Sequence, residues 1–322
     1  MANPTYAKVL EGAKIAKEQD VDLILAVGGG SVMDCCKAVS LAAVYDGDVW
    51  TDFWAKAGVI DVKPISLGII MTVSGTGSEM NGGAVITNEA LKIKTGRDYP
   101  ALNAQFALLD PLYTYTVPKL QMISGAFDSF THMMETYFSA PDVDNVSDSI
   151  NEALMKSVVR NLRRAIENPQ DYEARSNLVW LSTMAENRIL KMGKKGDFQG
   201  HILEHSLGAF TDCNHGCGLA VLLPVYYRHI KSAGAEKFAR FASEVWGISP
   251  EGKTTAELAN DGVEALAAFV KEIGLPTTLR ELGMTDDQKA WLPQIAAACV
   301  ASPGSYKHLD GDEILAIFEE AW

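Results

Sequence analysis

The stretch Val21-Asp22-Leu23-Ile24-Leu25-Ala26-Val27-Gly28-Gly29-Gly30-Ser31 decides the expected fold. Its first seven residues form a short apolar run of the kind found in a buried strand. Glycines follow this run, and residues 33–44 then have the apolar spacing of a helix. A strand, a glycine turn and a helix in this order form the repeating unit of a parallel sheet that helices cover on both faces.

The same alternation extends on both sides of this stretch. Residues 4–19 have helical spacing, and short apolar runs predict further strands at residues 65–71 and 106–109. After Pro118 strand signals are nearly absent, and long amphipathic patterns replace them at residues 125–139, 148–167, 172–191, 219–230, 255–273 and 312–322. The sequence therefore predicts an α/β domain over residues 1–115, followed by an all-helical domain over residues 116–322.

Charge and composition exclude several classes of partner. The formal net charge of −13 disfavours nucleic acids and anionic membranes, because both bind a basic protein surface. Apolar runs are broken by Gly, Pro or charged residues before they reach membrane-spanning length, and the first residues lack the pattern of a signal peptide. Five cysteines in 322 residues do not form a disulfide framework. We therefore expect a cytoplasmic protein.

Two glycine-rich turns are candidates for binding a phosphate group. Gly28, Gly29, Gly30 and Ser31 lie between a predicted strand and a helix, where glycines allow close approach to main-chain N–H groups. The segment at residues 74–79 follows the next predicted strand and mixes glycines with hydroxyl side chains. Turns of this kind at the carboxyl ends of neighbouring strands favour a dinucleotide pyrophosphate. Either turn is also compatible with a purely structural strand–helix connection.

Histidine and aspartate spacing predicts a metal site. Asp128 and His132 lie four residues apart in a helical pattern, which places both side chains on one face. His201 and His205 have the same spacing, and His215 follows in a segment that resembles a loop. Imidazoles combined with a carboxylate suit Fe(II) or Zn(II), whereas Mg²⁺ and Ca²⁺ prefer oxygen ligands alone.

Other interpretations of these residues remain open at the level of spacing. A single Asp/His pair on a helix can be a hydrogen-bonded polar pair without a metal. Cys213 and Cys217 flank His215 and could be soft ligands, but they lack the two-residue gap of common cysteine pairs. We interpret these two cysteines as small packing residues.

Five segments resemble motifs of one family. They are GGGSVMDCCK at residues 28–37, SGTGSE at 74–79, LDP at 109–111, GAFDSFTHMME at 125–135, and GHILEHSLG at 200–208 followed by HG at 215–216. In this order and spacing they resemble the motifs of iron-containing (group III) alcohol dehydrogenases, closest to the butanol dehydrogenase branch. The resemblance implies a dehydroquinate synthase-like fold, with a nucleotide-binding parallel sheet, a helical C-terminal domain and an active site between them.

Carried over residue by residue, the resemblance implies specific roles. The metal, Fe(II) or Zn(II), would bind Asp128, His132, His201 and His215. His205 would be a catalytic histidine near the nicotinamide and the substrate. NAD or NADP would contact Gly28, Gly29, Gly30, Ser31, Asp34, Thr72, Ser74, Thr76, Ser78 and Lys94. The expected substrates are small aliphatic alcohols and aldehydes of the butanol type, and the expected assembly is a homodimer.

One departure from the family concerns the beginning of the chain. Family members usually have a further segment before the region that starts here at Asn3, and it supplies the first strands of the nucleotide-binding sheet. We therefore expect a sheet without its first strands, with an exposed edge strand and a partly uncovered core. Cofactor affinity would be affected more than the metal site, whose residues are all present.

Two alternative functions follow from the same architecture. A metal- and NAD-dependent lyase resembling dehydroquinate synthase would need several Lys or Arg residues for its anionic substrate. The segments around Asp128 and residues 201–218 contain none, which favours a neutral alcohol or aldehyde. The second alternative is an inactive, truncated homologue that binds metal but not NAD(P).

Overall fold

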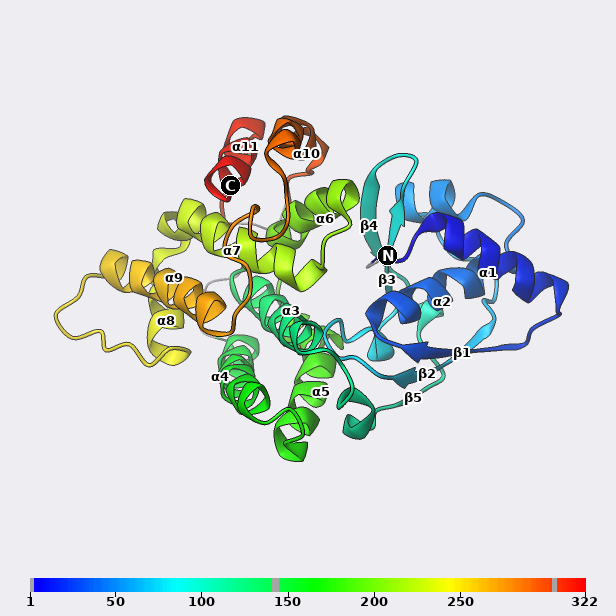
Figure 1. Cartoon of the computed structure of the whole chain (residues 1–322), viewed down its shortest axis with the longest axis horizontal. Helices are drawn as coiled ribbons and strands as arrows, with labels where there is room; N and C mark the ends of the chain where they lie inside the picture. The colour runs from blue at the N-terminus through cyan, green and yellow to red at the C-terminus, as the bar shows by residue number, and fades with distance from the viewer. Residues whose placement is uncertain (1–2, 141–144, 303–305) are drawn as a thin grey trace.

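The computed structural model describes residues 3–140, 145–302 and 306–322, and two sets of elements follow one another along the chain (Figure 1). The first set is α1 (Tyr6–Glu18), β1 (Leu23–Gly28), α2 (Gly30–Ala42), β2 (Ser66–Met71), β3 (Gly83–Asn88), β4 (Ile93–Asp98) and β5 (Phe106–Leu108). The second set is α3 (Lys119–Tyr137), α4 (Val146–Glu167), α5 (Tyr172–Glu186), α6 (Gln199–Thr211), α7 (His215–Ile230), α8 (Ala235–Glu244), α9 (Thr255–Glu272), α10 (Leu292–Ala298) and α11 (Gly311–Glu320). An α/β part thus precedes a helical part, as the sequence predicts.

The parallel sheet contains the three predicted strands in the order β1-β2-β5. Ala26 of β1 and Ile69 of β2 are fully buried and pack in one cluster with Met33 of α2 and Val179 of α5. The opposite face of the two outer strands is open, with large side chains that are 44–54% exposed: Leu23, Leu25, Val27, Phe106 and Leu108. One face of these two strands is therefore open to solvent among the described residues.

An antiparallel hairpin, β3–β4, was not predicted from the sequence. Its strands pair from Gly83 opposite Asp98 to Asn88 opposite Ile93. The hairpin contacts α2 on one side, and β4 contacts α6 of the helical part. Figure 1 shows it between the blue N-terminal elements and α6. It therefore brings residues of the α/β part to the helix that carries His201 and His205.

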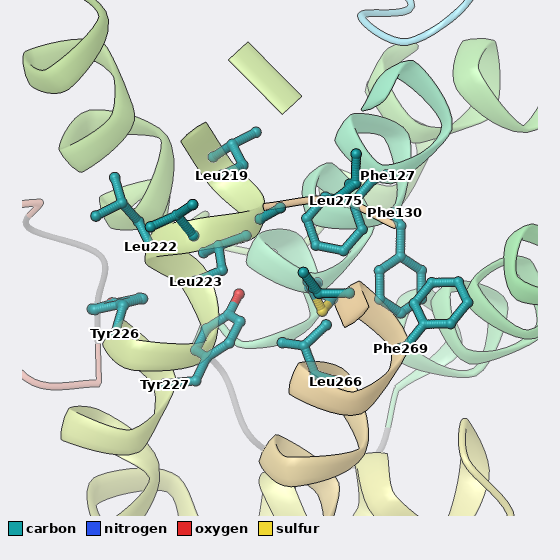
Figure 2. Close-up of a cluster of buried hydrophobic side chains, with 14 of the residues drawn as sticks. Phe127, Phe130, Leu219, Leu222, Leu223, Tyr226, Tyr227, Leu266, Phe269 and Leu275 are labelled. Carbon is teal, nitrogen blue, oxygen red and sulfur yellow. The ribbon is translucent and has the colours of Figure 1, made fainter. Parts of the chain in front are cut away.

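The core of the helical part surrounds α3 (Figure 2). Phe127 and Phe130 of α3 are fully buried and meet side chains of α7 and α9, among them Tyr227 and Phe269. Almost every residue of α3 after Gln121 is buried, because α4, α5 and α7 pack around it. A helix enclosed on several sides holds its polar side chains in fixed positions, and α3 carries Asp128 and His132.

Several predicted boundaries are wrong for identifiable reasons. The predicted helix at residues 172–191 ends at Glu186, because Arg188 has a φ of 74° and breaks the helical path. The helix predicted from residue 125 begins at Lys119, directly after Pro118. His215 does not lie in a loop but begins α7, where the Asn214 side chain accepts a hydrogen bond from Cys217 N–H at 3.0 Å. The helices α6, α8 and α10 were not predicted.

Among the helices of the described residues, none is both long and apolar enough to cross a membrane.

Candidate metal centre and glycine turns

Three helices bring the predicted metal-binding side chains together. Asp128 and His132 lie one turn apart on α3, His201 lies near the start of α6, and His215 is the first residue of α7. These positions converge because α7 packs against both α3 and α6. All four predicted ligands therefore lie in one cluster, although they are up to 87 residues apart in the sequence.

The potential ligand atoms point at a common place. Oδ1 of Asp128 lies 3.5 Å from Nε2 of His201, 3.5 Å from Nε2 of His215 and 3.7 Å from Nε2 of His132. Ligand atoms of Asp128, His201 and His215 all lie within 4.8 Å of one another. The ring of His132 stacks on that of His201, with centroids 4.5 Å apart. This donor set is the one that a borderline divalent ion such as Fe(II) binds.

Two of the converging atoms are unsatisfied in the protein itself. Within the described residues, Oδ1 of Asp128 and Nε2 of His201 are buried and have no hydrogen-bond partner. Burying a polar atom without a partner costs about 1–3 kcal/mol, so native proteins rarely leave two together. A metal ion bound between these atoms would remove the penalty. The residues present therefore fit a metal.

Two glutamates that were not predicted as functional residues orient the histidine rings. Glu135 accepts a hydrogen bond from Nδ1 of His201, and Glu204 accepts one from Nδ1 of His215. In the tautomer with its proton on Nδ1, the imidazole keeps a free lone pair on Nε2, the atom that faces Asp128 Oδ1. Carboxylate–histidine–metal arrangements have the same geometry. Each glutamate stands three residues after a predicted ligand, His132 or His201, and this helical spacing is the signal that could have identified them.

Electrostatics favour a charged Asp128 and a protonated His201 in the absence of a metal. Burial alone would raise the pKa of Asp128, but the neighbouring charges of His132, His215 and His201 outweigh it and hold this pKa well below the usual range. Burial would lower the pKa of His201, but the charge of Glu135 and contacts with Asp128 raise it to about 10. Metal binding must displace this proton, so it is coupled to proton release.

His205, the predicted catalytic histidine, lies beside this cluster. It sits one turn beyond His201 on α6, and its ring centroid is 5.6 Å from that of His215. Its potential ligand atom groups with those of Glu204 and His215. Burial and the positive charge of Lys94 lower the pKa of His205 well below the usual imidazole range. The imidazole is therefore neutral at neutral pH and able to accept a proton.

The absence of basic residues from the segments around the metal cluster does not mean that no cation lies near it, because Lys94 reaches it from β4. No basic residue lies in the segments around the histidines, but β4 brings the Lys94 ammonium to 2.9 Å from Glu204 Oε2 and 3.4 Å from His215 Nδ1. A single cation thus reaches the centre from the β3–β4 hairpin. It is already paired with Glu204, so it does not form the basic surface that an anionic lyase substrate would need.

The first glycine turn has an accessible helix start. Gly29 caps α2 without a side-chain hydrogen bond, and Gly29, Gly30 and Ser31 are at least partly exposed. A Cβ atom on Gly30 would lie 2.4 Å from a side-chain atom of Thr76, so only glycine fits this contact with the second turn. Thr76 is partly exposed, as are Thr72 and Ser74. The two turns are therefore neighbours, and an anion can approach the N-terminus of α2.

In the second glycine turn, two main-chain N–H groups are already hydrogen-bonded to a protein side chain. Ser182 of α5 accepts hydrogen bonds from Gly75 N–H at 2.8 Å and from Gly77 N–H at 3.2 Å. A Cβ on Gly75 would lie 3.4 Å from Oδ2 of Asp128, so the turn also touches the metal cluster. The turn thus connects the first glycine turn to Asp128.

Two residues predicted to contact the cofactor are buried partners of each other. Asp34 Oδ1 accepts a hydrogen bond from the Ser78 hydroxyl at 2.6 Å, and Oδ2 accepts one from Val85 N–H at 2.8 Å. The buried ammonium of Lys37 donates to the Ser78 carbonyl at 2.6 Å and to that of Gly83 at 2.8 Å. These contacts join α2, the second turn and β3. Asp34 and Ser78 thus support the turns from within.

Comparisons with known proteins agree on one family. Residues 1–111 match the model described as iron-containing alcohol dehydrogenase, and residues 122–322 match that of the Fe-containing alcohol dehydrogenase family, C-terminal. The chain is 37% identical to a probable NADH-dependent butanol dehydrogenase 1 of Bacillus subtilis, over 98% of this chain and 81% of the relative. It is 33% identical to the NADPH-dependent aldehyde reductase YqhD of Escherichia coli, over 88% of this chain and 73% of that relative.

Solved structures give the same result. The NADH-dependent butanol dehydrogenase A of Thermotoga maritima superposes with a TM-score of 0.92 at 35% identity, covering 100% of this chain and 81% of that one. A crystal structure of E. coli YqhD also superposes with a TM-score of 0.92, at 30% identity.

Proposed function

The chain belongs to the iron-containing alcohol dehydrogenase family, and we propose that it interconverts small aliphatic alcohols and aldehydes of the butanol type. It is an NAD(P)-dependent oxidoreductase. In the proposal, Fe(II) is held by four side chains: Asp128, His132, His201 and His215.

The observation that carries this proposal is the pair of buried atoms, Asp128 Oδ1 and His201 Nε2, that face each other without a hydrogen-bond partner among the described residues. A structural polar cluster would pair these atoms with donors. Once the Nε2 proton of His201 is released, the nitrogen and oxygen lone pairs converge, and hydrogen bonds to Glu135 and Glu204 hold the rings of His201 and His215 in this orientation. A mixed imidazole and carboxylate set of this kind suits iron.

The metal and the nicotinamide would supply the Lewis acidity and the hydride, and the chain itself would move the proton. When bound, Fe(II) supplies Lewis acidity toward an alcohol or aldehyde oxygen, and the nicotinamide supplies or takes up hydride. His205 is the chain's proton acceptor in alcohol oxidation and, once protonated, its donor in aldehyde reduction. Its depressed pKa keeps the imidazole neutral and ready for the oxidation direction.

The residues predicted to bind the cofactor fall into two groups: those that would contact it directly and those that hold the glycine turns in place. We propose that the pyrophosphate lies against the turn residues Gly29, Gly30, Ser31, Thr72, Ser74 and Thr76, which are at least partly exposed, next to the buried Gly28. Asp34 and Ser78 act indirectly, because their side-chain oxygens already hold α2, the second turn and β3 together. Lys94 likewise acts through Glu204.

The test is turnover of the purified chain. The protein is prepared anaerobically, loaded with Fe(II), and mixed with butanal and either NADH or NADPH while absorbance of the reduced nicotinamide is followed. The proposal expects loss of this absorbance with at least one cofactor. Iron binding without oxidation of either cofactor would contradict the dehydrogenase and favour the inactive homologue. A lyase would turn over its own substrate with no net change in NAD.

Location and assembly are part of the proposal as well. A cytoplasmic location is supported by the thiols, since all five cysteines are free. The homodimer stays a prediction, and light scattering on the purified protein measures it.

A further inference from the structure

We propose that Glu204 and Lys94 form a positioning pair that fixes His215 for metal binding. This inference rests on the proposed metal centre and extends it to two residues that would not touch the metal. Glu204 Oε2 accepts hydrogen bonds from both His215 Nδ1 and the Lys94 ammonium, the latter at 2.9 Å. The carboxylate thus fixes the tautomer of His215, and the lysine fixes the carboxylate.

Glu204 and Lys94 are both buried, so each charge needs the other as its partner. The side chain of Glu204 is 0% exposed and that of Lys94 is 3% exposed. A buried charge that loses its partner is strongly destabilised, so a lone Glu204 carboxylate at this place would be costly.

The surrounding chain is shaped to receive the pair. A Cβ atom on Gly218 of α7 would lie 2.8 Å from Cγ of Glu204, closer than a real Cβ approaches. A Cβ on Gly208 of α6 would lie 3.1 Å from both Lys94 Nζ and Glu204 Oε1. Glycines at these two positions therefore leave the room that the glutamate and lysine occupy.

Charge counting explains why a lysine is present beside a metal centre. The cluster contains three carboxylates, Asp128, Glu135 and Glu204, of which the last two bind histidine Nδ1 atoms. With neutral imidazoles and one Lys94, the sum is −2, which a single divalent ion neutralises. Buried centres are most stable when such charges are compensated. Lys94 also makes the nearby group of Glu204, His205 and His215 unsuitable for a second cation.

The pair connects two distant parts of the chain. Lys94 belongs to β4 of the hairpin, whereas Glu204 belongs to α6, 110 residues later. The orientation of His215 therefore depends on the contact of the hairpin with α6.

The test measures metal affinity without using turnover. Co(II) is titrated into the metal-free chain in competition with a chelator, and its visible absorption reports the ligand geometry. Glu204→Gln should weaken Co(II) binding about 10- to 100-fold and shift the absorption bands. The matched control is Glu152→Gln, which removes another buried carboxylate, paired with Arg240 at 2.6 Å, and should leave Co(II) affinity unchanged.

A double-mutant cycle tests whether Lys94 acts through Glu204. Lys94→Met alone should weaken Co(II) binding less than Glu204→Gln, and adding it to Glu204→Gln should cause no further loss. Fully additive losses would overturn the pair. If Glu204→Gln does not fold, Gly218→Ala leaves every charged group in place and should weaken Co(II) binding by displacing Glu204.

Failure of this inference is distinguishable from failure of the metal centre. Tight Co(II) binding by wild type, lost in His201→Ala but unchanged in Glu204→Gln and Gly218→Ala, would overturn the positioning pair alone. No Co(II) binding by wild type would overturn both.

Discussion

The hydroxyl of Ser182 accepts a hydrogen bond from the main-chain N–H of Gly75 across 2.8 Å. Gly77 N–H donates to the same oxygen at 3.2 Å. Ser182 lies on α5 in the helical part, whereas both glycines belong to the turn that follows β2. A helix of the second part therefore fixes the shape of a turn whose Thr76 contacts the first glycine turn at Gly30.

Ser182→Ala should weaken both stability and cofactor binding. It leaves two N–H groups of the turn without their acceptor, which costs about 1–3 kcal/mol each when they stay buried. We expect a lower thermal midpoint and a several-fold higher KM for the reduced nicotinamide, with a smaller change in kcat. Steady-state kinetics and thermal unfolding measure the two effects.

The control for this prediction is Ser40→Ala. Ser40 is also buried, but its hydroxyl only donates, to the Lys37 carbonyl at 2.7 Å. Its replacement leaves no N–H unsatisfied and should leave the cofactor KM unchanged. Equal KM values for Ser182→Ala and wild type would contradict the role of α5 in shaping the turn.

The features predicted correctly from the sequence have local physical causes. The family, the α/β part followed by helices, and the three parallel strands are confirmed. Apolar runs next to glycine turns identified β1 and β2, because strands of parallel sheets are continuous apolar runs. Of the two, β2 is largely buried, whereas Leu23, Leu25 and Val27 of β1 are about half exposed. The i, i+4 spacing placed Asp128 with His132 on one face of a predicted helix, which is α3. The same spacing suggested a shared face for His201 and His205, although the helix that carries them, α6, was not predicted.

The features missed depend on contacts between distant segments. Lys94 was predicted as a cofactor contact, whereas β4 places its ammonium against Glu204, 110 residues away, a pairing that no local pattern indicates. The hairpin was not predicted because β4 contains Lys94, Gly96 and Asp98, residue types that are uncommon in strands. His215 looked like a loop residue because its helix starts with glycines, whose low helix propensity masked the Asn214 cap.

His201→Ala should abolish metal binding and turnover together. It removes a buried Nε2 at the centre of the cluster and leaves Asp128 and Glu135 without a shared partner. We expect metal content near zero by elemental analysis after loading and dialysis. His229→Ala is the control, since this histidine pairs with Glu320 away from the cluster. Stoichiometric metal in His201→Ala would refute the ligand assignment.

His205→Ala should separate metal binding from proton transfer. Because His205 is a proposed proton acceptor and not a ligand, the variant should keep its metal but oxidise alcohol about 10²- to 10⁴-fold more slowly. In wild type, activity should fall only when the pH drops through the depressed pKa of His205, well below 6.5. The variant should lack this acid limb. An identical pH profile in both proteins would exclude the role.

Asp197 should make stability depend on pH. Its side chain is buried before α6, where Oδ1 accepts from Gln199 N–H and Oδ2 accepts from the Tyr226 hydroxyl, both at 2.9 Å. Burial, and then the charge of Glu135, raises the pKa of Asp197 from 3.8 to about 7. Between these two values the folded chain holds a proton that the unfolded chain has released. The free energy of unfolding therefore decreases as the pH rises from about 4 to about 7, and this contribution stays constant above that range.

Asp197→Asn removes this dependence while keeping the shape of the side chain. The amide oxygen can accept from Gln199 N–H, and the amide nitrogen can donate to the oxygen of Tyr226. Each unit of pKa shift corresponds to about 1.4 kcal/mol, so the variant should be more stable than wild type at pH 8, and by a larger margin than at pH 5. Denaturant unfolding of the metal-free proteins at both pH values measures the margins. Asp46→Asn makes the same chemical change on a side chain that is 95% exposed and should show no such difference. A margin for Asp197→Asn that is equal at pH 5 and pH 8 would mean that Asp197 is already charged in the folded chain.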